Sequence, residues 1–78
     1  MAEYRIQDIE CVEEYYNHDT KRRARVMYDG KAYEVHCYED GVFMGVIDLP
    51  GRSHYYAENT AENYVEDYGD FSEQLHPY

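Results

Sequence analysis

Three segments in the middle of the chain alternate between apolar and polar residues. They are "RRARVMY", "KAYEVHCY" and "VFMGVIDL". Period-2 alternation is typical of a β-strand that buries one face. Asp29-Gly30 separates the first two segments and Gly41 precedes the third, and Asp-Gly at such a position is a strong hairpin signal because the turn needs positive φ. Pro50-Gly51 then ends the third segment. The pattern predicts three antiparallel strands, near 22–28, 32–38 and 42–48.

The first part of the chain fits two patterns. A loose helical stripe is formed by Ile6, Ile9, Val12 and Tyr16. The alternation of Ile9 and Cys11 fits a strand instead. Charge favours the strand, because acids precede the polar turn at 17–20 and bases follow it, so a hairpin would pair them at roughly 0.2–1 kcal/mol each. The acids are Glu10, Glu13 and Glu14, and the bases are Lys21, Arg22, Arg23 and Arg25. We predict a long strand near 4–16, with a helix as the alternative.

The last part of the chain has helical spacing. Asn59 followed by Glu62 forms a capping box, and Gly69 is a natural stop. One apolar face is made by Ala61, Tyr64, Val65 and Tyr68. We predict a helix near 60–68 and then a short tail, from which Phe71 and Leu75 dock on the body. The expected fold is α+β: a four-stranded antiparallel β-meander with one C-terminal α-helix packed on one face, in a single domain, 1–78.

Composition changes this picture in one respect. Only 13 of the 78 residues are Val, Ile, Leu or Phe, and a share below about a fifth with high net charge is a mark of disorder. Eleven tyrosines argue for a folded chain, because this large, partly apolar residue can complete a core. The net charge of −10 repels nucleic acid and anionic membranes and attracts basic surfaces.

Candidate chemistry is sparse. The two cysteines are not in a Cys-x-x-Cys pair, and the four histidines (His18, His36, His54 and His76) lack metal-ligand spacing. The N-terminal residues are polar and acidic, and no apolar run reaches the roughly 18 residues of a membrane span. The sequence therefore predicts a cytoplasmic protein with free thiols. It predicts no metal, no cofactor, no catalytic residue and no enzyme activity.

The charges fall into blocks. Residues 53–78 hold six acids and no lysine or arginine, interleaved with tyrosines. This block fits either a solvated surface or a docking surface for a basic partner, because spaced carboxylates and aromatic anchors complement a groove of Lys and Arg. "KRRAR" at 21–25 fits an internal complement to the chain's own glutamates better than a nucleic-acid patch. The predicted partner-binding residues are Glu58, Glu62, Glu66, Asp67, Asp70, Glu73, Tyr56, Tyr64 and Tyr68; Tyr64 and Tyr68 could instead belong to the core.

Small size, acidity, tyrosine content and a strand-rich body with an acidic helix together resemble, in type, the small phage-encoded anti-CRISPR proteins and other DNA mimics. The resemblance covers the whole chain in character but rests on no motif, so no functional residue is carried over from it. It implies a stoichiometric inhibitor that occludes the nucleic-acid site of a basic protein or nucleoprotein complex, such as a CRISPR effector. Members of this group do not all act by mimicry, so the mode stays open.

Two other functions fit the sequence. A structural or assembly protein could self-associate through tyrosine-rich strands, as a homodimer. A small enzyme or ligand-binding domain would need a deep pocket around His36 or His54. The main hypothesis expects a monomer or homodimer that binds neither nucleic acid nor membrane directly.

Overall fold

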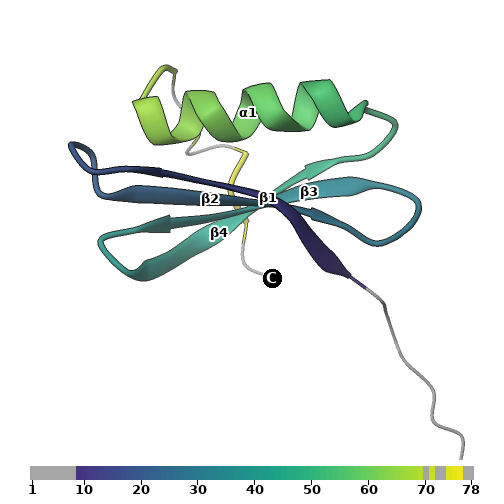
Figure 1. Cartoon of the computed structure of the whole chain (residues 1–78), viewed down its shortest axis with the longest axis horizontal. Coiled ribbons are helices and arrows are strands. Elements are labelled where there is room, and N and C mark those ends of the chain that lie inside the picture. The colour runs from purple at the N-terminus through teal and green to yellow at the C-terminus, as the bar shows by residue number, and fades with distance from the viewer. Residues whose placement is uncertain (1–8, 70, 72–73, 77–78) are drawn as a thin grey trace, which may run out of the picture.

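The computed structural model describes residues 9–69, 71 and 74–76. These residues form one antiparallel sheet of four strands in the order β1-β2-β3-β4, with a single helix lying across one side of it (Figure 1). The elements are β1 (Glu10–Asn17), β2 (Arg22–Tyr28), β3 (Tyr33–Glu39), β4 (Val42–Leu49) and α1 (His54–Glu66). The predicted α+β meander is confirmed, and the three middle strands lie within one residue of their expected bounds.

Tight turns hold the strands in this order. Asp29 Oδ1 accepts hydrogen bonds from the backbone N–H groups of Lys31 and Ala32, both at 2.9 Å. Asp40 and Gly41 join β3 to β4 with φ of 55° and 83°, a left-handed conformation that glycine tolerates without cost and aspartate more readily than most residues. The predicted Asp-Gly hairpins therefore form.

β1 is a strand, so the helical alternative for this part of the chain is wrong. The strand begins at Glu10; residues 4–8 of the predicted strand lie outside the described residues. Glu14 pairs with both Arg23 and Arg25, as the charge argument expected. Glu13, by contrast, lies opposite Val26 in the regular register of the hairpin, so it is off the predicted charge ladder.

The helix begins earlier than its sequence pattern predicts. Ser53 is the N-cap, and its side-chain oxygen accepts from the backbone N–H of Tyr56 at 3.1 Å, so Asn59 as N-cap is wrong. The earlier start places Ala57 in the core, where it is fully buried. Asp67, in the left-handed conformation, caps the C-terminal end. Within the described residues no helix is long and apolar enough to cross a membrane.

The core lies between the sheet and α1, which packs on β1, β2 and β3. Its buried residues are Ala24, Val26, Val35, Cys37, Ile47, Leu49, Ala57, Ala61, Tyr64 and Val65. Tyr64 is the largest of the fully buried side chains, and Tyr15 and Tyr33 pack against the cluster. Tyrosines thus supplement a thin aliphatic core, as the composition predicted.

The described C-terminal residues contact the outer edge of β4 at Val46. Val46 and His76 exchange two backbone hydrogen bonds of 2.8 and 3.1 Å, and Phe71 and Leu75 pack on the core as predicted. Gly45 has φ of 141°, and a Cβ there would lie 3.0 Å from the His76 carbonyl oxygen. This close approach of two backbones explains a glycine inside a strand.

Burial of Cys37 should make the protein less stable in alkali. Burial raises the pKa of this thiol to about 12, although Arg22 acts in the opposite direction. An unfolded thiol has a pKa of about 8.5, so above that pH the unfolded chain releases a proton that the folded chain keeps, and stability falls. From pH 7 to pH 10 the wild type should lose about 1–2 kcal/mol more unfolding free energy than Cys37→Ala. Urea denaturation at the two pH values measures this; equal losses would contradict it.

Candidate functional site

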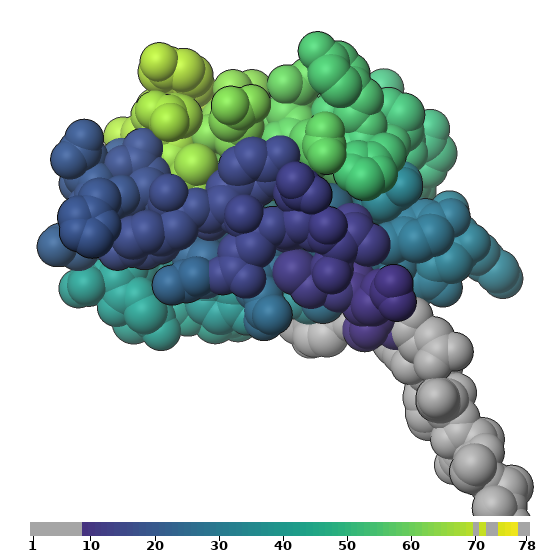
Figure 2. Space-filling model, in the orientation of Figure 1, coloured from purple at the N-terminus to yellow at the C-terminus, as the bar shows by residue number. Residues whose placement is uncertain are grey.

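Acidic side chains form a row along the side of α1 that adjoins β1. Glu58, Glu62 and Glu66 follow one another at i, i+4 and i+8, so their carboxylates lie on one stripe, about 6 Å apart along the helix axis. Tyr55 lies on the same stripe, three residues before Glu58, and its side chain is 72% exposed. β1 and α1 run side by side on this face of the molecule (Figure 2).

Glu13 brings β1 into the same surface. One carboxylate oxygen of Glu13, one of Glu58 and a ring nitrogen of His54 all lie within 4.8 Å of one another. His54 Nε2 is 2.9 Å from Glu58 Oε2, and the His54 ring packs against Tyr33 with centroids 5.3 Å apart. We name the surface made by Glu13, Tyr55, Glu58, Glu62 and Glu66 the acidic ridge.

The field of the acidic ridge acts on a neighbouring tyrosine. Burial raises the pKa of Tyr15, and the charges of Glu58, Glu13 and Glu62 raise it further. Three carboxylates from two elements therefore act on one phenol. Glu13 lies opposite the buried Val26 and therefore on the helix side of the sheet.

Two carboxylates of the ridge lack cationic partners among the described residues. Glu62 and Glu66 are exposed and form no ion pair with any residue that the structure describes, and α1 has no basic residue in its last turn. Two negative charges at i, i+4 destabilise a helix mildly, and Glu66 also opposes the negative end of the helix dipole. This arrangement costs stability and leaves negative charge free for a partner.

The arginines of the basic segment 21–25 form ion pairs with acidic residues of the same chain, as predicted. Arg22 Nη1 lies 3.2 Å from Asp67 Oδ1, and Arg22 Nε lies 3.7 Å from Glu39 Oε1. Arg23 and Arg25 share Glu14. None of these pairs includes a carboxylate of the acidic ridge, although Asp67 directly follows Glu66.

The predicted partner-binding acids have different outcomes. Glu58, Glu62 and Glu66 lie together on the ridge. Asp67 is the C-cap of α1 and its carboxylate pairs with Arg22, so part of its charge is neutralised. Asp70 and Glu73 lie outside the described residues.

None of the three predicted aromatic contacts belongs to the ridge as defined. Tyr64 is 2% exposed, and its hydroxyl donates to the Tyr38 carbonyl at 3.3 Å, so it is a core residue. Tyr56 shares its flank of the helix with Thr60 and faces the Arg52 guanidinium at 4.5 Å. Tyr68 follows the C-cap and is 66% exposed.

Two ridge residues were absent from the predicted set. Tyr55 falls on the acidic stripe only when the helix begins at His54, and the capping box at Asn59 concealed that start. "SHYYAENTAE" does contain the signal, because Tyr55, Glu58 and Glu62 are spaced i, i+3, i+7. Glu13 had no comparable signal, since its approach to Glu58 depends on the packing of α1 beside β1, which the residue pattern does not show.

A divalent cation is the one inorganic ligand that the described side chains of the ridge suggest. Glu13, His54 and Glu58 offer two carboxylates and an imidazole, which are ligands that Zn²⁺ accepts in proteins. Their side chains are exposed or half-buried, and carboxylates and histidines commonly cluster on exposed surfaces with no ion bound. We therefore treat Glu13 and Glu58 only as members of the acidic ridge, with His54 as their neighbour.

Comparison with known proteins identifies no relative. No family model, no curated protein and no solved structure matches the chain. The role of the ridge is therefore inferred from its geometry and charge.

Proposed function

We propose that the chain is a stoichiometric inhibitor that inserts its acidic ridge into the basic, nucleic-acid-binding groove of another protein. The inhibitor blocks that groove by occupying it and catalyses no reaction. A CRISPR effector complex is the partner class that the resemblance to anti-CRISPR proteins suggests. The observation that carries the proposal is the row of Glu58, Glu62 and Glu66 on one stripe of α1, in which Glu62 and Glu66 form no ion pair with a described residue and Glu58 contacts only the His54 ring.

The spacing of the row supports imitation of a nucleic-acid strand. Three glutamates over two turns of helix place one negative charge about every 6 Å, and Glu13 adds another charge beside the row. One DNA strand carries one phosphate charge about every 3.4 Å along the duplex axis. The ridge is therefore a less dense but regular anionic row, of the kind that a line of Arg and Lys side chains complements.

A rigid scaffold supports the same role. α1 is held on the sheet by four buried residues, Ala57, Ala61, Tyr64 and Val65, so the carboxylates are arranged before the partner arrives. Prior arrangement lowers the entropy cost of binding. Tyr55 supplies an exposed aromatic anchor among the charges, and tyrosine is enriched at binding hot spots.

Self-association through tyrosine-rich strands receives less support. The bridge between Val46 and His76 occupies part of the outer edge of β4, whereas no described strand pairs with the outer edge of β1. Two copies of β1 would bring Glu10, Glu13 and Glu14 of each chain together, and like charges across a ladder are destabilising. Light scattering on a size-exclusion column tests this alternative, which expects a stable dimer.

Salt dependence and competition test the proposal. The immobilised protein should capture a basic nucleic-acid-binding protein or nucleoprotein from bacterial lysate at low salt. It should release that partner near 1 M salt, where the Debye length is about 3 Å. Added DNA should compete with the chain for the purified partner, because both would occupy one groove. Capture that is indifferent to salt, or a partner that binds DNA and the chain together, would reject the proposal.

A further inference from the structure

The side of the sheet opposite α1 carries a second, chemically different surface. Because side chains alternate across a strand, the residues before and after each buried strand residue point away from the helix. Strand register aligns Tyr16, Arg23, Tyr38 and Phe43 in one row across all four strands. The adjacent row contains Glu14, Arg25, His36 and Val46, the last of which is fully buried. We call these two rows the open face.

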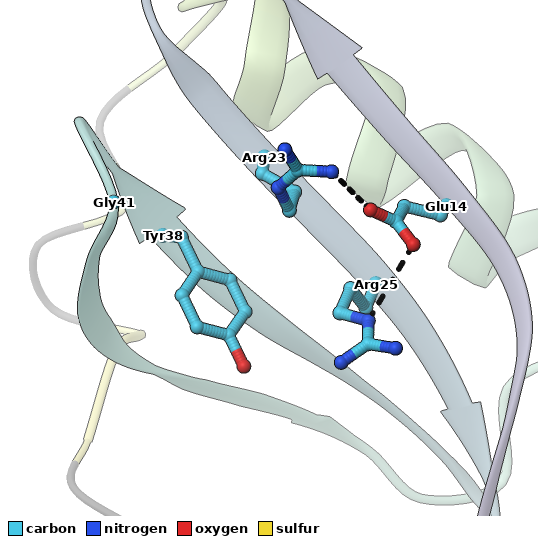
Figure 3. Close-up of a pocket in the computed structure, with 5 residues that line it drawn as sticks. All are labelled: Glu14, Arg23, Arg25, Tyr38 and Gly41. Atoms are coloured by element: carbon cyan, nitrogen blue, oxygen red, sulfur yellow. Dashed lines mark hydrogen bonds and ion pairs between the residues drawn. The ribbon is translucent and has the colours of Figure 1, made fainter.

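A shallow cavity lies in the open face. It has a volume of about 380 Å³ and is lined by Glu14, Arg23, Arg25, Tyr38 and Gly41. Figure 3 shows the four side chains on the side of the sheet away from the helix, with both arginines directed at Glu14. This volume lies within the range of small-molecule sites, about 300–1,000 Å³.

The cavity has more positive than negative charge. One carboxylate, Glu14, serves two guanidinium groups, Arg23 and Arg25. Arg25 Nε is buried and has no hydrogen-bond partner among the described residues, since the nearest Glu14 oxygen is 3.6 Å away. Buried polar groups are seldom left unsatisfied. An anion that accepts from both guanidinium groups would satisfy this nitrogen and balance the surplus charge.

Aromatic rings surround the arginines. The Arg23 guanidinium lies over the Tyr16 ring, 4.9 Å from its centroid. Phe43 packs edge-on against Tyr38 with centroids 5.5 Å apart. Tyr16 and Phe43 are 48% and 41% exposed, respectively. Exposed rings beside an anion-binding pair of arginines suit a ligand that has both a planar ring and a negative group.

We propose that the open face binds a mononucleotide, with its phosphate on Arg23 and Arg25 and its base against Phe43 and Tyr38. A single nucleotide fits better than a polynucleotide, because the chain's net charge of −10 repels a polyanion much more than one phosphate group. Glu14 occupies the phosphate position in the absence of ligand and is displaced from at least one arginine on binding. The site lies across the sheet from α1 and does not depend on the inhibitor function.

Calorimetric titration with AMP, adenosine, inorganic phosphate and a twelve-nucleotide single-stranded DNA tests the proposal. AMP should bind more tightly than adenosine or phosphate, because only AMP makes both kinds of contact, and more tightly than the oligonucleotide. No AMP binding at millimolar concentration overturns the proposal. Phosphate binding as tight as that of AMP would indicate a simple anion site, and tighter oligonucleotide binding would indicate a nucleic-acid surface; either result also overturns it.

Three variants locate the site. Arg23→Lys and Arg25→Lys keep the charge but remove the planar fork, and each should weaken AMP binding about tenfold. Glu14→Gln removes the competing carboxylate and should tighten AMP binding. Arg52→Ala, next to Tyr56 on the helix side, is the matched control and should leave AMP affinity unchanged. Circular dichroism checks that each variant is folded. A folded Glu14→Gln that binds AMP more weakly would overturn the placement of the phosphate.

Discussion

Replacing Glu62 and Glu66 with lysine should weaken binding of a basic partner by about a hundredfold or more, because each exchange turns an attraction into a repulsion. Both side chains are exposed and pair with no cation among the described residues. The fold should survive, since lysine and glutamate have similar helix propensities and a lysine at position 66 would favour the helix dipole. Binding of the partner found by capture, measured by surface plasmon resonance or calorimetry, gives the size of the effect.

A matched control separates position from total charge. Glu62→Lys and Asp48→Lys change the net charge equally, but Asp48 is exposed on β4, where it lies across from Glu34 and pairs with His76 at 2.8 Å. An exposed ion pair contributes about 0–1 kcal/mol, so Asp48→Lys should remain folded. If the two single variants weaken binding equally, the charge acts without regard to its position and the acidic ridge is not the docking surface.

Removing the Tyr64 side chain should cost most of the stability of this small protein. Tyr64→Ala is expected to lower the free energy of unfolding by about 3–5 kcal/mol, the usual cost of truncating a buried aromatic residue. A domain of this size has only about 4–12 kcal/mol in total. Tyr64 contacts Phe71 at a centroid distance of 5.6 Å, and the Arg22 guanidinium lies 4.6 Å from its ring centroid. Thermal and urea denaturation followed by circular dichroism measure the loss.

Tyr64→Phe separates packing from hydrogen bonding at the same position. It keeps the ring and removes only the hydroxyl that donates to the Tyr38 carbonyl at 3.3 Å. The expected cost is about 0.5–1.5 kcal/mol. Tyr64→Phe should therefore retain partner binding. If the variant is folded but no longer binds the partner, Tyr64 belongs to the partner-binding surface despite its burial.

Local patterns predicted the elements well where each residue's neighbours in sequence decide the conformation. The strands on either side of Asp29-Gly30 and Asp40-Gly41 followed from period-2 alternation and from turns that need positive φ. The start of α1 did not follow, because both Ser53 and Asn59 are good N-caps. Burial of Ala57 against the sheet decided between them, and that contact depends on residues distant in the sequence.

The sequence by itself determined the fold class and the excess of negative charge near the C-terminal end, since both depend on periodicity and composition. Only the tertiary structure decided which side chains share a surface. Packing of α1 beside β1 brought Glu13 next to Glu58, and the true helix start put Tyr55 beside Glu58. Strand register placed Arg23 and Arg25 in one cavity with Tyr38. Each outcome depends on a one-residue shift or a packing contact, and a shift of one residue in a strand moves every side chain to the other face.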